Sequence, residues 1–328
     1  MEYRRLGASG LLVSEISYGN WLTHGSGGNS GECVRAALDA GVNLFHTAAA
    51  WGQGAAEEAL AEGLAGTPRG DLVLSTGVFW PEGPGANQRG LSRKHLHSSI
   101  HGSLRRLGTD HIDLYQLLSF DYQTPLEETF LALADLVRQG KILYVGTAEW
   151  TAEQIQRGAV LAAELRVPLV SNQPHYSMLW RVPESQVMPV AERTGIGQLA
   201  SVSLAQGVLT GKYGGGHVPA DSRAAGDPWA KGAVTPLLHA DLLDRVELLR
   251  GVAEHAGLTM AQLAIAWTLQ NRGVSSVVVG ASAPEQVVEN TKASGMVLDL
   301  DVLTQIDQLL GTFVQTDPRL TFAPPQYR

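Results

Sequence analysis

Cysteine is nearly absent from the chain, which has one among its 328 residues, so no disulfide can form within it. That residue, Cys33, lies in a helix-like run whose spacing turns it toward a core, which favours a buried, inert thiol over a nucleophile. No apolar run reaches the roughly eighteen residues of a membrane-spanning helix, and the charged start of the chain lacks the apolar core of a signal peptide. We therefore expect a cytoplasmic protein without a membrane partner.

Positive charge is also scarce. The net charge is -8 and the pI is about 5.7, whereas binding to nucleic-acid phosphates requires clustered Lys and Arg. Two short basic pairs, at residues 93–94 and 105–106, fall in a helix-like stretch and are interpreted as solvated faces. His95 and His97 are two residues apart in the same stretch, so they cannot face one ion together. The sequence predicts neither a nucleic-acid partner nor a metal site.

The chain is rich in apolar residues, which make up 44% of it and recur in a regular order. Eight short apolar runs are each followed by an amphipathic, helix-like segment. The predicted strands are residues 15–18, 43–46, 72–76, 112–117, 142–145, 168–171, 198–202 and 275–279. The helices predicted to follow them are residues 31–40, 55–64, 92–107, 125–138, 152–165, 183–193, 242–255 and 284–293.

This alternation predicts an α/β fold with a parallel sheet, because right-handed crossovers place the helices outside it. Eight units in one chain favour a closed (β/α)8 TIM barrel over an open sheet, and no Gly-x-Gly-x-x-Gly follows an early strand as a Rossmann fold requires. Residues 3–13 predict an N-terminal β-hairpin at the barrel floor, and residues 259–271 and 299–310 predict extra C-terminal helices. We expect residues 1–328 to form a single domain.

Ordered motifs resemble those of the aldo-keto reductase superfamily, and within it the potassium-channel-β-like branch. The leading motifs are residues 42–52 (Val-Asn-Leu-Phe-His-Thr-Ala-Ala-Ala-Trp-Gly), 74–80 (Leu-Ser-Thr-Gly-Val-Phe-Trp) and 113–120 (Asp-Leu-Tyr-Gln-Leu-Leu-Ser-Phe). Further matching blocks lie at residues 18–21, 91–95, 106–116, 124–129, 171–177, 204–213 and 280–290. The resemblance covers essentially the whole chain.

The resemblance implies a catalytic tetrad of Asp, Tyr, Lys and His, in which the Tyr supplies the proton for carbonyl reduction. The corresponding positions here hold His46, Trp51, Gly77 and Leu118. Trp51 can donate a hydrogen bond but not a proton, and Gly77 and Leu118 can do neither. Because all four members differ, ordinary carbonyl reduction is not expected.

The resemblance also implies an NADPH site. Asn172 and Gln173 match positions that hold the nicotinamide carboxamide, whereas residues 201–203 lack the aromatic ring that stacks on nicotinamide. Toward the phosphates and adenosine, the implied residues are Lys212, Ser222, Arg223, Ser282, Gln286, Glu289 and Asn290. A simpler interpretation is equally open: Ser282 caps a helix, Glu289 and Asn290 lie on the surface, and the strand-end amides pair with nearby backbone. The adenosine end of the site is thus expected to be better retained than the nicotinamide end.

Aromatic residues concentrate near the predicted strand ends. They are Trp21, Trp51, Phe79, Trp80, Phe120, Tyr122 and Trp180, and His24 and His175 are expected on the same face. Such a set predicts an apolar substrate pocket with a few polar tips, although packing between loops explains any single ring as well. A histidine can titrate near neutral pH, and at a strand end His46 is expected to be either an acid–base group or a hydrogen-bonded structural residue.

Three functions are compatible with these features. The favoured one is a repurposed enzyme that acts on an apolar, carbonyl-bearing metabolite by elimination, isomerisation or cyclisation, with His46 as the acid–base group. The second is an NADPH-dependent oxidoreductase that reduces a pre-activated iminium ion or enone without the usual proton donor. The third is a non-catalytic ligand-binding or partner subunit, and resemblance to the channel-β-like branch implies association into homo-oligomers.

Overall fold

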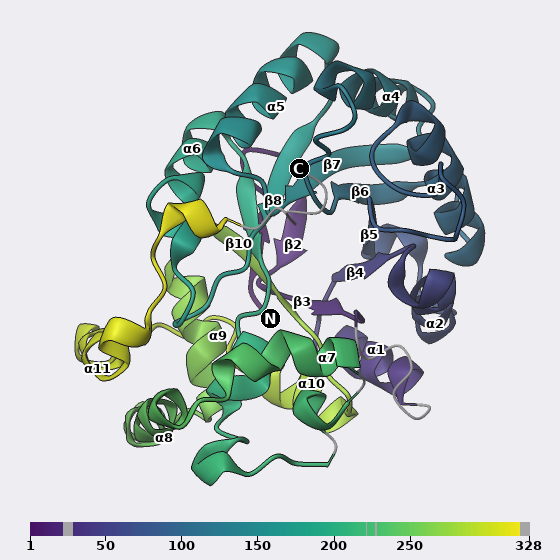
Figure 1. The fold of residues 1–328 in the computed structure, drawn as a ribbon. Helices are drawn as coiled ribbons and strands as arrows, with labels where there is room; N and C mark the ends of the chain where they lie inside the picture. The colour runs from purple at the N-terminus through teal and green to yellow at the C-terminus, as the bar shows by residue number, and fades with distance from the viewer. Residues whose placement is uncertain (22–28, 221, 227, 322–328) are drawn as a thin grey trace.

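A closed barrel of eight parallel strands forms the centre of the molecule in the computed structural model, which describes residues 1–21, 29–220, 222–226 and 228–321 (Figure 1). The strands pair in chain order, and the last closes the barrel against the first. This arrangement confirms the predicted (β/α)8 architecture. The strands are β3 (Ile16–Gly19), β4 (Leu44–Ala48), β5 (Val73–Val78), β6 (Ile112–Leu117), β7 (Ile142–Ala148), β8 (Leu169–Gln173), β9 (Gly197–Ala200) and β10 (Val274–Val279).

Helices surround the barrel on its outer side (Figure 1). They are α1 (Ser30–Asp39), α2 (Ala55–Gly63), α3 (Arg93–Arg106), α4 (Leu126–Arg138), α5 (Ala152–Leu165), α6 (Val187–Thr194), α7 (Pro228–Val234), α8 (Ala240–His255), α9 (Met260–Gln270), α10 (Pro284–Thr291) and α11 (Leu300–Leu310). Short 3-10 turns are η1 (Trp51–Gly54), η2 (Arg69–Asp71), η3 (Val182–Glu184), η4 (Ala205–Thr210), η5 (Gly214–Gly216), η6 (Arg223–Ala225), η7 (Thr235–Leu237), η8 (Gly311–Phe313) and η9 (Pro318–Leu320). Within the described ranges, no helix combines the length and the apolar character needed to cross a bilayer.

One predicted helix assignment is wrong. Residues 242–255 were expected to cover the barrel between the seventh and eighth strands, with residues 259–271 as an extra helix. Instead α9 packs against β10, whereas α8 lies outside it and packs against α11. α9 is buried on nearly every side, which is typical of an apolar helix held between two layers, and α8 has exposed residues such as Leu248.

Local sequence signals set the start of two helices. Thr151 and Thr259 each form a capping box, in which the Thr hydroxyl accepts from the N–H three residues on and a Gln side chain accepts from the Thr N–H. Gln154 and Gln262 supply those amides. α5 and α9 therefore begin directly after these threonines.

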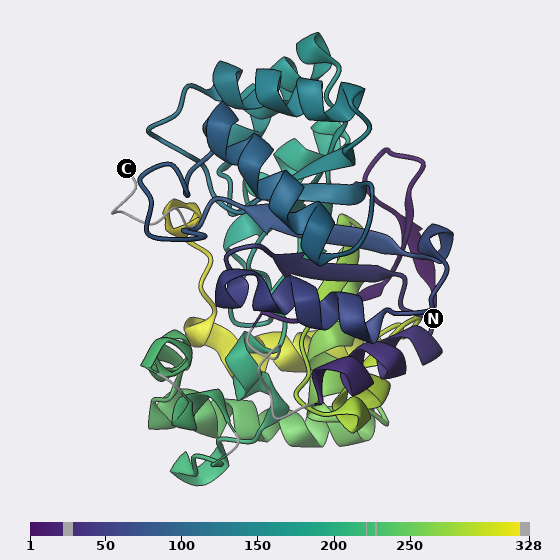
Figure 2. The same cartoon turned by 90° about the vertical axis from the view of Figure 1, so that its right-hand side faces the viewer.

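The floor of the barrel is an apolar cluster that includes residues of the N-terminal hairpin, β1 (Tyr3–Arg5) and β2 (Leu12–Ser14). Leu6 and Val13 from this hairpin are fully buried and meet inward-pointing residues of the strands. Figure 2 shows the hairpin at one end of the barrel, as predicted. The cluster consists of Leu6, Val13, Leu44, Val73, Leu114, Val170 and Leu199.

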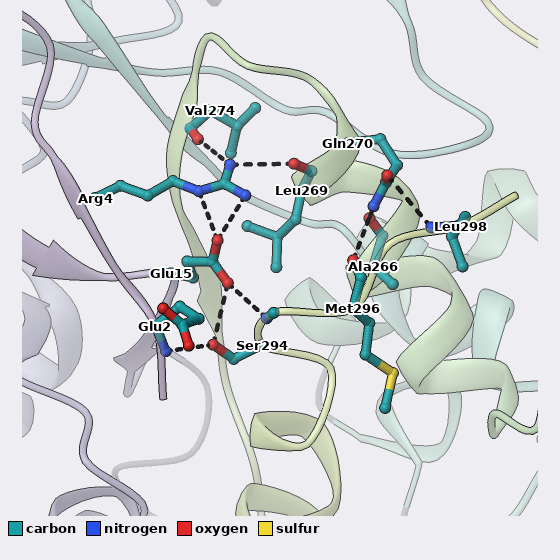
Figure 3. Close-up of polar contacts among 11 residues, drawn as sticks. Glu2, Arg4, Glu15, Ala266, Leu269, Gln270, Val274, Ser294, Met296 and Leu298 are labelled. Atoms are coloured by element: carbon teal, nitrogen blue, oxygen red, sulfur yellow. Dashed lines mark hydrogen bonds and ion pairs between the residues drawn. The ribbon is translucent and has the colours of Figure 1, made fainter.

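An ion pair between the buried Glu15 and the partly exposed Arg4 fastens the hairpin to the barrel (Figure 3). Glu15 is 4% exposed, and its Oε1 accepts from Arg4 Nε at 2.6 Å. Arg4 Nη1 also donates to the carbonyl oxygens of Leu269 and Val274. The second oxygen of Glu15 accepts from the N–H of Gly295. This network joins the beginning of the chain to the segments around β10 and after α10.

Two expectations about individual side chains have different outcomes. Cys33 is buried, as predicted, and burial raises the pKa of its thiol. Arg106, however, is not part of a solvated face, because its Nε donates to Oε2 of Glu57 at 2.6 Å. Glu57 is fully buried, and its Oε1 also accepts from the Thr76 hydroxyl. The buried carboxylate therefore ties together α2, α3 and β5.

Candidate active site

The four predicted tetrad positions lie together at the C-terminal ends of β4, β5 and β6, where barrel enzymes place their chemistry. His46 is on β4 and Gly77 on β5, Trp51 begins η1, and Leu118 follows β6. His46 and Gly77 point into the barrel, because the intervening position on β5, Thr76, hydrogen-bonds to α2 outside it. A surface hollow of about 500 Å³ beside Arg4 lies at the opposite end of the barrel.

His46 is held as a neutral imidazole. Its side chain is almost fully buried, and Nδ1 lies 2.9 Å from Ser75 Oγ. The ring meets the edge of Trp51 with centroids 5.3 Å apart. Burial lowers the pKa of His46 to about 4, since the charged form loses its hydration. This environment suits a hydrogen-bonding group better than an acid at neutral pH.

Gly77 and Leu118 fit each other sterically. A Cβ atom on Gly77 would lie 2.6 Å from Cγ and Cδ2 of Leu118. Leu118 therefore fills the space that any longer side chain at position 77 would occupy. The two residues form an apolar contact at the mouth of the barrel.

Gln173 and Asn172 point to opposite faces of β8. Register places Gln173 beside Ala148 on the inner face, and within the described residues its amide makes no hydrogen bond. Asn172 faces outward, where its Oδ1 accepts from Thr147 Oγ1 at 3.0 Å and its Nδ2 donates to Gln198 Oε1 at 3.3 Å. Of the two amides expected at the nicotinamide carboxamide, only Gln173 points toward the mouth.

The inner ends of the strands thus form a mouth layer of small, apolar and amide side chains. Its members are Ala48, Gly77, Leu118, Ala148 and Gln173. None of these groups is an acid or a base at neutral pH. Any proton needed here must come from another part of the molecule or from solvent.

Several of the predicted aromatic residues contact one another. Trp21 and Trp51 lie 6.4 Å apart between ring centroids and continue the contact of Trp51 with His46. Phe79 and Trp80 form an edge-to-face pair, with centroids 5.2 Å apart. These two groups come from the loops after β3, β4 and β5.

A third aromatic group follows β6 and β7. Phe120 contacts Trp150 at 5.1 Å and Tyr122 at 4.9 Å between centroids. Tyr122 is 42% exposed and its hydroxyl accepts from Gln154 on α5, so it lies at the rim. Trp150 is fully buried and was not singled out from the sequence, although its position two residues beyond β7 was a signal.

His175 and Trp180 lie on the segment after β8. The N–H of His175 donates to the Glu149 carboxylate, and the backbone of Trp180 pairs with Ser177 and with Gln315. His24 lies outside the described residues. Among the described residues, the hydrogen-bond partner of His46 is Ser75.

Two predicted phosphate ligands meet at the turn after β9. Arg223 donates to the side chain of Gln206, and its guanidinium lies 5.8 Å from the ring centroid of Trp21. Lys212 runs beside Gly207, where a Cβ atom would be 3.5 Å from Lys212 Cε. Burial lowers the pKa of Arg223. Two cations therefore border the end of β9, the end of a barrel that commonly binds phosphate.

The predicted adenosine ligands at α10 are already engaged in local contacts. Ser282 donates to Gln286 Oε1 through its N–H at 3.0 Å and its hydroxyl at 3.3 Å, and both side chains are exposed. Because Ala283 is the N-cap residue, Ser282 does not cap the helix. Glu289 lies 3.8 Å from Lys292. Asn290 is 6% exposed, so it is not a surface residue.

Ser222 is the last predicted cofactor residue. It is 5% exposed, and its hydroxyl donates to the carbonyl oxygen three residues earlier at 2.6 Å. This contact stabilises the turn that carries Arg223. Within the described ranges, no three His, Cys, Asp or Glu side chains gather as a metal site would require.

These features define a (β/α)8 barrel protein with a candidate site at the C-terminal ends of its strands. Residues 15–310 match the model of the Aldo/keto reductase family, and the chain belongs to this family.

Relatives of known name cover nearly the whole chain. A probable voltage-gated potassium channel subunit beta of Oryza sativa subsp. japonica is 40% identical over 98% of this chain and 99% of its own length. The protein of the same name from Arabidopsis thaliana is 39% identical over the full length of both. The L-glyceraldehyde 3-phosphate reductase of Escherichia coli O157:H7 is 38% identical over 94% of this chain and 92% of its own.

Proposed function

We propose that this chain is an NADPH-dependent reductase whose substrate carries an already activated electrophile, such as an enone or an iminium ion. The observation that carries the proposal is a mouth layer without an acid beside a buried, neutral His46. Reduction of an ordinary ketone produces an alkoxide that needs a nearby proton donor. An enone or iminium ion accepts hydride without forming an alkoxide.

Retention of NADPH is supported by family membership and by the relative named as a reductase. When bound, NADPH supplies a hydride to the substrate. Gln173 would hold the carboxamide through its unpaired inner amide, while Lys212 and Arg223 would bind phosphate. Ser282 and Gln286 are exposed at the start of α10 and suit the adenosine end.

His46 would stabilise negative charge on the substrate rather than transfer a proton. If the Ser75 hydroxyl donates to Nδ1, the single imidazole proton lies on Nε2. For an enone, hydride adds to the β-carbon, the C=C electron pair moves to the carbonyl, and an enolate oxygen forms. Nε2–H donates a hydrogen bond to that oxygen, and the α-carbon takes its proton from solvent. A pKa near 4 keeps the imidazole neutral throughout.

The test follows NADPH absorbance with cyclohex-2-enone and with hexanal. We expect cofactor consumption with the enone and none above background with the aldehyde. NADPH carrying deuterium at the transferable position should place the label on the β-carbon of the product. Hexanal turnover at a comparable kcat/KM would contradict the proposal and indicate an ordinary carbonyl reductase.

Elimination, isomerisation or cyclisation catalysed by His46 is less well supported, because an imidazole with a pKa of about 4 is a weak base and the described residues give it no titrating partner. Conversion of a carbonyl substrate without NADPH would favour this alternative.

One observation favours a partner-subunit role: two of the relatives are named as channel subunits. Assembly of this chain into a homo-oligomer belongs with that alternative. A chain that binds NADPH but turns over neither enone nor iminium substrates would favour it.

A further inference from the structure

The inside of the barrel between its apolar floor and its mouth layer is polar. Six strands each contribute one inward-pointing polar residue to this middle layer, and none is more than 3% exposed. The interior of such barrels is ordinarily filled by branched aliphatic side chains. A polar layer at this depth needs hydrogen-bond partners for its members. The six residues of the middle layer are Ser17, His46, Ser75, Gln116, Ser171 and Ser276.

Four of the six residues form two hydrogen-bonded pairs with one another. His46 pairs with Ser75 at 2.9 Å, and Ser276 donates to Ser17 at 3.0 Å. Gln116 and Ser171 are different. Both are 0% exposed, and no described group hydrogen-bonds to the amide of Gln116 or to the hydroxyl of Ser171. Leaving buried groups of this kind unpaired destabilises the fold.

Gln116 and Ser171 converge over a glycine of the strand between them. A Cβ atom on Gly146 would clash with both Gln116 Oε1 and Ser171 Oγ, so only glycine leaves room for the two polar groups. The next inward-pointing residue of β7 toward the mouth is Ala148. Between the mouth and the Gln116–Ser171 pair, β7 therefore presents only small residues to the barrel interior.

We infer that Gln116 and Ser171 form a subsite for an uncharged hydroxyl or carbonyl group of the substrate, an inference that rests on the proposed function. The amide and the hydroxyl each offer donors and acceptors, which matches such a group. No member of the middle layer is charged, so a carboxylate or phosphate would lose its hydration without a counter-charge. The substrate then combines an apolar body at the aromatic mouth with a neutral polar end inside the barrel.

The experiment compares two probes, cyclohex-2-enone and 4-hydroxycyclohex-2-enone, by their kcat/KM with NADPH. We expect the wild-type chain to prefer the hydroxylated probe by about tenfold or more, since a site built for a hydroxyl rejects the analogue that lacks it. Gln116→Met and Ser171→Ala should each reduce this preference ratio at least fivefold or so, chiefly through KM. Ser276→Ala, which alters an already paired serine of the same layer, should keep the ratio.

Thermal unfolding separates a binding effect from a folding defect. Both test variants remove an unpaired buried group, so they should unfold at or above the wild-type temperature. A wild-type ratio near one, or a ratio unchanged in both variants, overturns the inference.

If the protein turns over neither probe, the proposed function fails, and the subsite is then tested by binding alone. Ligand-observed NMR measures whether 4-hydroxycyclohex-2-enone binds to the protein. Binding that is weakened by Gln116→Met supports the subsite even when no turnover occurs. A crystal structure of the soaked protein that shows only water on Gln116 and Ser171 overturns it.

Discussion

Burial of His46 makes the stability of the protein depend on pH. The folded-state pKa is about 4, whereas an unfolded chain has a histidine pKa of about 6.5, so the unfolded state binds more protons between these values. The stability contributed by His46 is therefore complete above about pH 6.5 and is lost as the pH falls toward 4. The full effect is on the order of 3 kcal/mol.

His46→Gln removes this titration and keeps a group that can pair with Ser75. We expect the free energy of unfolding in urea to fall less steeply for the variant than for the wild type between about pH 7 and pH 4. Because the buried His95 and the partly buried Glu82 also have shifted pKa values, the difference between the two proteins, rather than either curve, isolates His46. Parallel curves would mean that His46 is not held neutral.

Gly77 and Leu118 should behave as a coupled pair. Gly77→Ala forces Leu118 out of its place and should cost about 1–3 kcal/mol, while Leu118→Ala leaves a cavity and should cost about 2–5 kcal/mol. In the double variant the new methyl group enters the vacated space. Urea unfolding should then show a double-variant cost smaller than the sum of the single costs by about 0.5–3 kcal/mol. Strict additivity would show that the two side chains do not compete for one space.

At the scale of elements, the N-terminal hairpin offers a matched comparison of two leucines. Leu6 is fully buried in the floor cluster, whereas Leu12 on β2 is 50% exposed. Leu6→Ala should lower the free energy of unfolding by about 2–5 kcal/mol, and Leu12→Ala should change it by no more than about 0.5 kcal/mol. Chemical denaturation of both variants measures the difference. Equal costs would mean that the hairpin does not plug the barrel.

The order of elements could be predicted from the sequence because each strand–helix unit carries its own pattern of apolar residues. The assignment of α8 and α9 could not, since both are helices and only their packing partners distinguish them, although the uniform apolar character of α9 was a usable signal. At the site, motif order located His46 and Gly77. The direction of the side chains at the end of β8 could not be predicted, because a bulge between β7 and β8 helps decide that Gln173 points inward and Asn172 outward.

The polar middle layer illustrates the same limit. Gln116 lies among apolar residues of β6 and Ser171 begins the polar run Ser171-Asn-Gln of β8, and neither pattern tells which face of its strand the residue is on. Their convergence over Gly146 depends on the stagger of three neighbouring strands, which no local pattern encodes. Sequence reasoning therefore recognised the barrel and its mouth, but not what its interior contains.

At the scale of the whole molecule, the ion pair of Arg4 and Glu15 connects the N-terminal hairpin to residues 269–295 across the junction of β10 and β3 (Figure 3). Arg4 reaches the carbonyl oxygens of Leu269 and Val274, and Glu15 reaches the N–H of Gly295. These contacts lie where the barrel closes. Their loss should therefore weaken the cooperative unit as a whole rather than loosen one terminus.

Glu15→Gln should lower the free energy of unfolding by about 1.5–3 kcal/mol, because it replaces charge-assisted hydrogen bonds of the partly exposed Arg4 guanidinium with neutral ones. Glu247→Gln is the control: Glu247 and Arg250 form an exposed pair on α8, worth about 0.5 kcal/mol or less. Urea unfolding should give one transition of unchanged slope in both variants, shifted strongly only in the first. A Glu15 variant as stable as the control, or one that loses only the hairpin in a separate early transition, would show that the barrel closes without this pair.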